Sequence, residues 1–183
     1  MKKILTILFI GLLNFNSNAL ANDKILDSLN EGKKLIFIRH ALAPGNGDPN
    51  NFLINDCSTQ RNLNKDGIEQ SKKIGKLFKD YKIPIDKVLS SEWCRCKDTA
   101  KFAFKNYEIF KGLNSFYDEK FYKNKDDQIK SLRTLISNWD GKKNIIFVTH
   151  FVVISEIFNI GISSGEMLIS DKNYSIVGNI ETN

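Results

Sequence analysis

Four side chains suited to phosphoryl chemistry stand just after short apolar runs of the chain. They are Arg39, His40, Arg95 and His150. Apolar runs of this kind are typical of buried parallel strands, and ligands of open α/β sheets bind where such strands end. The chain contains two histidines, and both stand at such positions. We therefore expect the four side chains to meet at one edge of a sheet.

Two guanidinium groups and two imidazoles that meet in this way would bind a tetrahedral dianion. The planar fork of an arginine pairs with two phosphoryl oxygens at once. A neutral imidazole nitrogen can then attack phosphorus and form a covalent phosphoenzyme, while the cations stabilise the charge on the equatorial oxygens. The pattern predicts a phosphate pocket that contains a nucleophilic histidine.

Alternating strands and helices must position these residues. Strands are expected at 35–38, 87–90, 107–110 and 144–148, with closing strands at 166–169 and 174–177 that form an antiparallel edge. Helices are expected at 64–81, where Asn64 is the N-cap, and at 94–104, 126–139 and 152–158. This order predicts an α/β fold, a three-layer α/β/α sandwich around a mainly parallel sheet.

Two segments carry no periodic pattern. Residues 41–63 contain two prolines and two glycines and are long for a loop of a compact domain. Ordered loops of this length are usually functional, so we expect this one to border the pocket. Residues 111–125 are polar and aromatic without a clear period, and we predict a loop there as well.

The first 21 residues form a pattern of their own. Lys2 and Lys3 precede an apolar run of ten residues, and Ala19-Leu20-Ala21 is the small-x-small pattern that a signal peptidase accepts. Ten apolar residues are too few to cross a bilayer core of about 30 Å as a helix. We expect a signal peptide at 1–21 that is cleaved near Ala21, a single domain at 22–183, no membrane span, and a periplasmic or secreted location.

Composition narrows the classes of partner. Removal of the two lysines with the signal peptide lowers the formal net charge from +6 to +4, and the remaining lysines form no basic stripe with interleaved aromatic residues. Nucleic acid is therefore not an expected partner, whereas a mild positive field suits an anionic substrate. The two histidines lie 110 positions apart with no carboxylate spaced beside either, so we expect no metal and no cofactor.

The three cysteines offer one disulfide in an oxidising compartment. Cys94 and Cys96 are too close in sequence to join comfortably. Cys57 is therefore predicted to pair with Cys94 or Cys96, and pairing with Cys94 would tie the long loop beside Arg95. Three free thiols are the alternative. A cysteine phosphatase is excluded, because the positions that would need arginine hold Leu63, Ala100 and Phe102.

Four segments together resemble the histidine phosphatase superfamily, which is also called phosphoglycerate mutase-like. They are Ile36–His40, Asn64–Gln70, Ser90–Ala100 and Phe147–His150. Their order and spacing agree with those of the family, and the resemblance covers nearly all of the chain after the signal peptide. The small size is most similar to the compact phosphohistidine-phosphatase type. Residues 56–63 also resemble a stretch in exported bacterial members.

The resemblance implies a phosphoglycerate mutase-like fold and a phosphatase in which His40 is the nucleophile. Arg39, Arg95 and His150 would complete the phosphate pocket. Arg61, Asn114 and Ser115 are further candidates for substrate contacts, and a surface role is an equal alternative for Arg61 and Asn114.

The chain departs from the family pattern at the acid that protonates the leaving group. Many members carry a Glu for this purpose, and the matching position here holds Ser115. Asp118 and Glu119 follow a few residues on and are either substitutes for that Glu or solvated loop acids, so the sequence does not identify the proton donor. His150 is not followed by Asp, so the donor of acid phosphatases is missing too. Ala41 replaces a frequent Gly, a small residue for a small residue. Without a strong general acid, the enzyme should favour good leaving groups.

These observations predict an exported enzyme that hydrolyses a phosphomonoester or phosphoramidate through a phosphohistidine on His40. The partner would be a small phosphorylated substrate, with envelope phosphosugars as one class that export suggests. The alternative from another class is a non-catalytic phosphate-binding or phosphosugar-binding module with the same pocket, because fold does not imply function.

Overall fold

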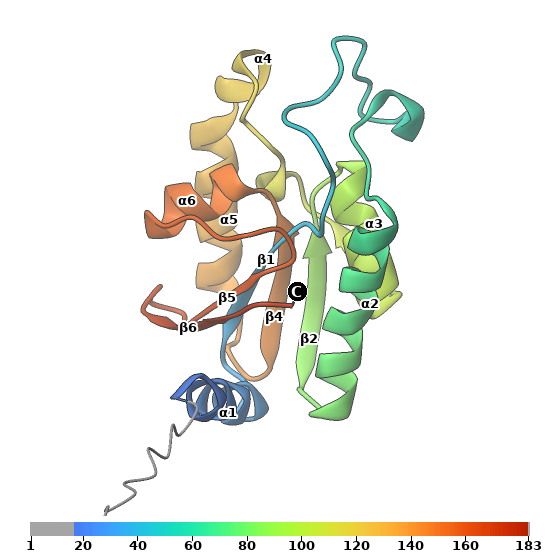
Figure 1. Ribbon diagram of the computed structural model, residues 1–183. Coiled ribbons are helices and arrows are strands. Elements are labelled where there is room, and N and C mark those ends of the chain that lie inside the picture. Colours follow the sequence, from blue (N-terminus) through green and yellow to red (C-terminus); the bar gives the residue numbers. More distant parts are fainter. Residues whose placement is uncertain (1–16, 183) are drawn as a thin grey trace, which may run out of the picture.

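Six strands form one sheet in the computed structural model, which describes residues 17–182 (Figure 1). They are β1 (Leu35–Arg39), β2 (Ile85–Ser90), β3 (Glu108–Ile109), β4 (Asn144–Thr149), β5 (Met167–Ser170) and β6 (Ile176–Ile180). Their order is β3-β2-β4-β1-β5-β6. The first four strands run parallel, and β5 and β6 add an antiparallel edge. The predicted fold class is confirmed.

Helices cover both faces of this sheet, as Figure 1 shows. On one side are α2 (Lys65–Asp80) and α3 (Cys94–Phe104), and on the other α5 (Lys125–Asn138) and α6 (Phe151–Phe158). The alternation of side chains along β1 explains this arrangement. Ile36 and Ile38 pack into the core under α2 and α3, whereas Leu35 and Phe37 pack into the core under α5 and α6. A strand that is buried on both faces reads as a continuous apolar run.

The N-cap of α2 fixes the point where the 41–63 loop ends and the helix begins. The side chain of Asn64 caps the helix by accepting a hydrogen bond from the backbone nitrogen of Gly67 at 2.8 Å. A Cβ atom at Gly67 would lie 2.1 Å from the carbonyl oxygen of Leu42. Only glycine permits this approach, so the helix start packs directly against the chain that follows His40.

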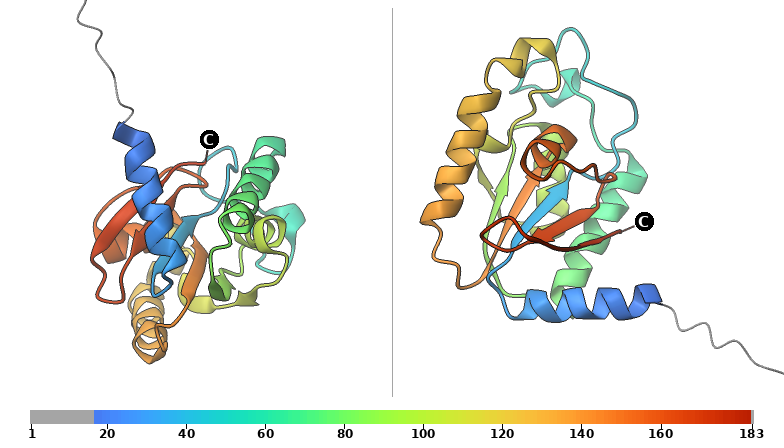
Figure 2. Two further views of the ribbon diagram at one scale, coloured as in Figure 1. Left: turned by 90° about the horizontal axis from the view of Figure 1, so that it is seen from below. Right: turned by 90° about the vertical axis from the view of Figure 1, so that its left-hand side faces the viewer.

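A helix that the sequence did not predict precedes the sheet. This helix, α1 (Ser17–Asn30), lies across the end of the sheet opposite the 41–63 loop (Figures 1 and 2). Its Ile25, Leu26 and Leu29 are buried in the core under α2 and α3. Most of the predicted signal peptide lies outside the described residues, and 17–21 form the first turns of α1. Between residues 17 and 182, no helix is long and apolar enough to cross a membrane.

The segments predicted as loops hold short helical turns. Residues 111–125 contain a 3-10 turn, Lys111–Leu113, and the helix α4 (Glu119–Tyr122), and the 41–63 loop contains a 3-10 turn at Cys57–Thr59. Full burial of Leu113 stabilises the first of these turns through contacts that no local period reveals. The strand predicted at 107–110 is only two residues long, because it pairs only with the last two residues of β2.

Candidate active site

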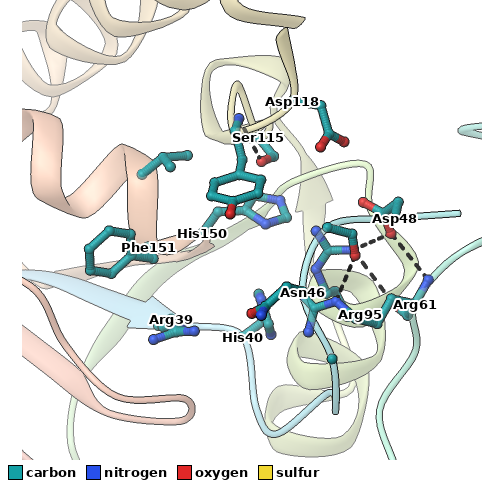
Figure 3. Close-up of a pocket in the computed structure, with 14 residues that line it drawn as sticks. Arg39, His40, Asn46, Asp48, Arg61, Arg95, Ser115, Asp118, His150 and Phe151 are labelled. Atoms are coloured by element: carbon teal, nitrogen blue, oxygen red, sulfur yellow. Dashed lines mark hydrogen bonds and ion pairs between the residues drawn. The ribbon is translucent and has the colours of Figure 1, made fainter. Parts of the chain in front are cut away.

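A cavity of about 290 Å³ opens at the carboxyl ends of β1, β2 and β4. All four residues singled out from the sequence line it, namely Arg39, His40, Arg95 and His150 (Figure 3). The rings of the two histidines meet edge to face with their centroids 5.5 Å apart. The parallel strands thus bring together side chains that lie up to 111 positions apart in the sequence.

The hydrogen bond of His40 determines which ring nitrogen is available for attack. Nδ1 lies 2.9 Å from the carbonyl oxygen of Ala41, and a carbonyl can only accept, so Nδ1 carries the proton. Nε2 is therefore the bare nitrogen. Burial, followed by the charge of Arg95, holds the pKa of His40 well below its ordinary value. The imidazole is neutral at pH 7 and keeps the lone pair that a nucleophile needs.

Two of the arginines that line the cavity each have a buried donor without a partner among the described residues. Arg39 donates from Nη1 to the carbonyl of Ile162 at 2.8 Å, and Arg95 donates from Nη1 to Asp48 at 2.7 Å. The Nε atoms of Arg39 and Arg95 are buried and have no hydrogen-bond partner within the described residues. An unpaired buried donor is costly, so an acceptor that reached these N–H groups would stabilise the site.

Asp48 is a central residue of the site that the sequence analysis missed. One of its carboxylate oxygens accepts from Arg95 and from the backbone nitrogen of Arg61, and the other accepts from the indole nitrogen of Trp93. Burial by itself would raise the pKa of Asp48, but the hydrogen bond and charge of Arg95 bring that pKa below its ordinary value. Asp48 is a lone acid in an aperiodic loop, and nothing in its spacing distinguishes it.

The 41–63 loop is attached to the start of α3 by three further contacts. Cys57 and Cys94 form a disulfide with their Cα atoms 5.7 Å apart, and Cys96 is a buried free thiol. The side-chain oxygen of Gln60 accepts from the backbone nitrogen of Cys94 at 2.9 Å and so caps α3 from a distance. Phe52 stacks on Trp93 at 5.3 Å between ring centroids. The loop therefore fixes the helix that carries Arg95.

Thr99, the threonine of the Ser90–Ala100 segment, links two parts of the site. Its hydroxyl donates to the carbonyl of Arg95 at 2.7 Å and accepts from the backbone nitrogen of Ala41 at 2.9 Å. Thr99 thereby joins the first turn of α3 to the residue that follows His40. This buried contact links the backbone beside His40 to the helical turn that carries Arg95.

Of the remaining predicted site residues, some line the cavity and others do not. Arg61 lines the cavity, and its guanidinium donates to the carbonyls of Gly47 and Ala43. Ser115 and the half-buried Asp118 also line the cavity. Glu119 is exposed at the start of α4 and does not line it.

Asn114 does not line the cavity either, although it was considered as a substrate contact. It is buried behind the wall, where its side-chain oxygen accepts from Ser91 and from the backbone nitrogen of Glu92. Asn114 can therefore act on a substrate only through its neighbours.

Residues 35–115 match the sequence model of the histidine phosphatase superfamily (branch 1). This segment contains β1, the long loop, α2, β2 and α3, and with them Arg39, His40 and Arg95. The predicted resemblance is confirmed, and with it the prediction of a phosphatase enzyme. No curated protein sequence matches the chain significantly.

Solved structures extend the comparison to the whole sheet. The structure of the protein histidine phosphatase SixA complexed with tungstate has a TM-score of 0.58 at 14% identity, over 81% of this chain and 97% of that chain. A protein of Agrobacterium tumefaciens, provisionally named phosphohistidine phosphatase SixA, has a TM-score of 0.55 at 17% identity, over 82% and 99%. A Thermus thermophilus protein named TTHB049 has a TM-score of 0.56 at 13% identity, over 80% and 98%. These similarities show a shared fold.

The two neutral, buried imidazoles predict that stability falls in mild acid. Burial holds the pKa of His40 and of His150 well below 6.5 in the folded chain. Below pH 6.5 the unfolded chain binds protons that the folded chain does not. The free energy of unfolding then falls by about 1.4 kcal/mol per pH unit for each imidazole. Urea unfolding in phosphate-free buffer between pH 7.5 and 5 measures this slope.

The variant His40→Asn is the control for this slope. It retains one buried imidazole, so the slope below pH 6.5 should be about half that of the parent chain. A free energy of unfolding that stays constant between pH 7.5 and 5 in the parent chain would contradict the buried neutral state of both rings.

Proposed function

We propose that this chain is an exported histidine phosphatase that hydrolyses a phosphomonoester or phosphoramidate through a phosphohistidine at Nε2 of His40. One observation carries the proposal. The Nδ1–H of His40 donates to Ala41, and His40 with its bare Nε2 lines the same cavity as Arg39 and Arg95. A neutral nucleophile among unpaired cationic donors suits a phosphoryl group. The match to the superfamily over residues 35–115 supports the same chemistry.

In the first chemical step, the Nε2 lone pair of His40 attacks phosphorus. An N–P bond forms, the bond from phosphorus to the leaving group breaks, and the leaving group departs with that electron pair. Arg39 and Arg95 donate to the equatorial oxygens as their charge redistributes. The imidazole becomes positively charged, and the hydrogen bond from Nδ1 to Ala41 stabilises that charge.

In the second step, water attacks phosphorus of the phosphohistidine. An O–P bond forms, the N–P bond breaks, and His40 recovers the Nε2 lone pair. The product phosphate carries one oxygen from water. Because the low pKa of His40 favours the neutral ring, the free imidazole is a good leaving group in this step.

We further propose that Asp118 supplies the proton to the leaving group. Asp48 is unsuited, because Arg95 and two other donors hold it as a carboxylate. Asp118 lines the cavity, and its carboxyl group has no hydrogen-bond or ion-pair partner among the described residues. It lies beside Gly47, across the cavity from His40 in Figure 3. By microscopic reversibility, the same carboxylate would take the proton of the attacking water.

Turnover and covalent trapping test the proposed function. The purified chain should hydrolyse p-nitrophenyl phosphate, and His40→Ala should lower kcat by at least about 10³-fold because the nucleophile is lost. Brief incubation with ³²P-labelled phosphohistidine, followed by an alkaline detergent quench that preserves N–P bonds, should label the parent chain and not His40→Ala. Binding of orthophosphate without any turnover above the His40→Ala background would instead identify a non-catalytic binding module.

The dependence on leaving group tests the role of Asp118. A poor leaving group such as the glycerol alkoxide needs a proton, whereas p-nitrophenolate does not. Asp118→Asn should therefore lower kcat about 10²-fold on glycerol phosphate and less than about threefold on p-nitrophenyl phosphate. Glu119→Gln, the neighbouring acid outside the cavity, is the matched control and should change neither rate. Equal effects of Asp118→Asn on both substrates would argue against proton donation.

Export is supported by three features of the chain. The pattern of residues 1–21 is typical of a signal peptide. The disulfide between Cys57 and Cys94 suits an oxidising compartment. The buried Ile25, Leu26 and Leu29 of α1 all lie after Ala21, so cleavage there leaves the packed face of this helix with the domain. An exported phosphatase would meet phosphorylated compounds of the cell envelope, including phosphosugars.

Export predicts a processed N-terminus. Protein recovered from the periplasm or the medium should begin at Asn22 by N-terminal sequencing. Ala21→Tyr should retain the precursor, because a signal peptidase requires a small residue before the cut. Active protein that begins at Met1 and remains in the cytoplasm would overturn this part of the proposal.

A further inference from the structure

Asn114 is the start of a buried hydrogen-bond chain that ends on His150. The backbone nitrogen of Glu92 can only donate, and it lies 2.9 Å from the side-chain oxygen of Asn114. The amide nitrogen of Asn114 lies 2.7 Å from the carboxylate of the same Glu92. These two contacts determine the orientation of the amide, so an acceptor, not a donor, faces Ser91.

Ser91 links the amide of Asn114 to the imidazole of His150 and determines the direction of the hydrogen bond between them. Its hydroxyl has one proton, and the amide oxygen of Asn114 at 3.1 Å has none, so Ser91 donates to Asn114. Nε2 of His150 lies 2.9 Å from the same hydroxyl oxygen. Since the serine proton is already used, His150 must be the donor in this contact. The second lone pair of the hydroxyl accepts from the backbone nitrogen of Trp93 at 3.3 Å.

The surroundings of this chain agree with a proton on Nε2 of His150. Cys96 places its sulfur 3.4 Å from that nitrogen, and its thiol faces the carbonyl of Thr149 at 3.6 Å. With the thiol proton directed to that carbonyl, the sulfur is a second weak acceptor for Nε2–H. Ser91 and Cys96 are fully buried and Asn114 nearly so, which excludes water as an alternative partner.

We propose that Asn114 and Ser91 are positioning residues that hold His150 as the Nε2–H tautomer, with Nδ1 as the bare nitrogen left for the substrate. Nδ1 has no partner among the described residues. His40 is held in the opposite tautomer by Ala41. The two rings of the cavity therefore present one nucleophile and one proton acceptor.

The bare Nδ1 gives His150 a defined part in binding, and this part rests on the function proposed above. A monoprotonated phosphoryl group transfers its P–OH proton to Nδ1, which yields an imidazolium beside a dianion. Nε2–H keeps donating to Ser91 before and after this transfer. No hydroxyl has to turn, so the site is preorganised for the charged state. In the other tautomer the bare nitrogen would be Nε2, which faces Ser91. Protonation there would require the Ser91 hydroxyl to break its hydrogen bond to Asn114 and turn.

The tautomers can be measured directly, because the chain contains only two histidines. In the ¹⁵N-histidine-labelled, untagged full chain at pH 7.5, one ring should show a protonated Nε2 and a bare Nδ1, and the other the reverse. Ser91→Ala should shift the first ring and leave the second unchanged, which assigns the first to His150. Saturating orthophosphate should then protonate both nitrogens of His150. A protonated Nδ1 and bare Nε2 on His150 in the free chain would overturn the proposal.

Variants of Asn114 test the chain with a matched control. Asn114→Leu should produce a mixture of His150 tautomers and lower kcat about tenfold or more, as a misdirected imidazole does in other enzymes. Asn114→Asp combined with Glu92→Gln restores an acceptor toward Ser91 and a donor at position 92, and should recover the Nε2–H tautomer. Asn144→Ala removes a buried amide whose hydrogen bonds go to Leu29 and Pro84 at the far end of β4. It should lower stability and leave both imidazole spectra unchanged.

The imidazole spectra and the turnover measurements together distinguish a failure of this inference from a failure of the proposed function. The spectra of the free chain need no turnover, so a chain with opposite tautomers but no phosphatase activity would sink the function and leave the positioning role intact. If Asn114→Leu kept the kcat of the parent chain and the His150 spectrum were unchanged, the positioning role would be wrong and the proposed function would stand.

Discussion

The buried ion pair between Asp48 and Arg95 is the interaction on which the site depends. Their side chains are only 2% and 4% exposed, so each charge is stable there only because the other is present. Removal of one partner from such a pair costs roughly 3–5 kcal/mol. The pair occupies Nη1 of Arg95, whose buried Nε has no hydrogen-bond partner among the described residues. It also joins the 41–63 loop to α3, so one contact both orients Arg95 and closes the wall of the cavity.

Desolvation makes the same cavity suited to an anion. Arg39, Arg61 and Arg95 meet there, and burial together with the charge of Arg95 lowers the pKa of Arg39 and of Arg61. The two imidazoles stay neutral for the same reasons. A site in which further positive charge is already disfavoured gains most from a bound dianion. A phosphoryl group would relieve the repulsion and supply acceptors to the unpaired Nε atoms.

Hydrogen bonds whose direction is fixed place the ring proton on Nδ1 of His40 and on Nε2 of His150. The carbonyl of Ala41 can only accept, which leaves His40 with a bare Nε2. The chain from Asn114 through Ser91 imposes the opposite polarity on His150. Two chemically identical side chains whose centroids are 5.5 Å apart thereby acquire different functions, because their second ring nitrogens meet different neighbours.

The sequence by itself determined the six strands, the four helices that cover the sheet and four residues of the candidate site. The apolar runs before His40 and His150 predict buried parallel strands, and such strands must end at one edge, so the convergence of these residues followed from period and order alone. The Asn64 cap and the apolar face of α2 were equally local signals. Tertiary structure alone decided the roles of Asp48 and Asn114 and the existence of α1. Asp48 meets Arg95 across 47 positions, and Ser91 meets His150 across 59. A lone polar residue in an aperiodic segment acquires its function from the partner that folding brings to it, and no spacing along the chain encodes that partner.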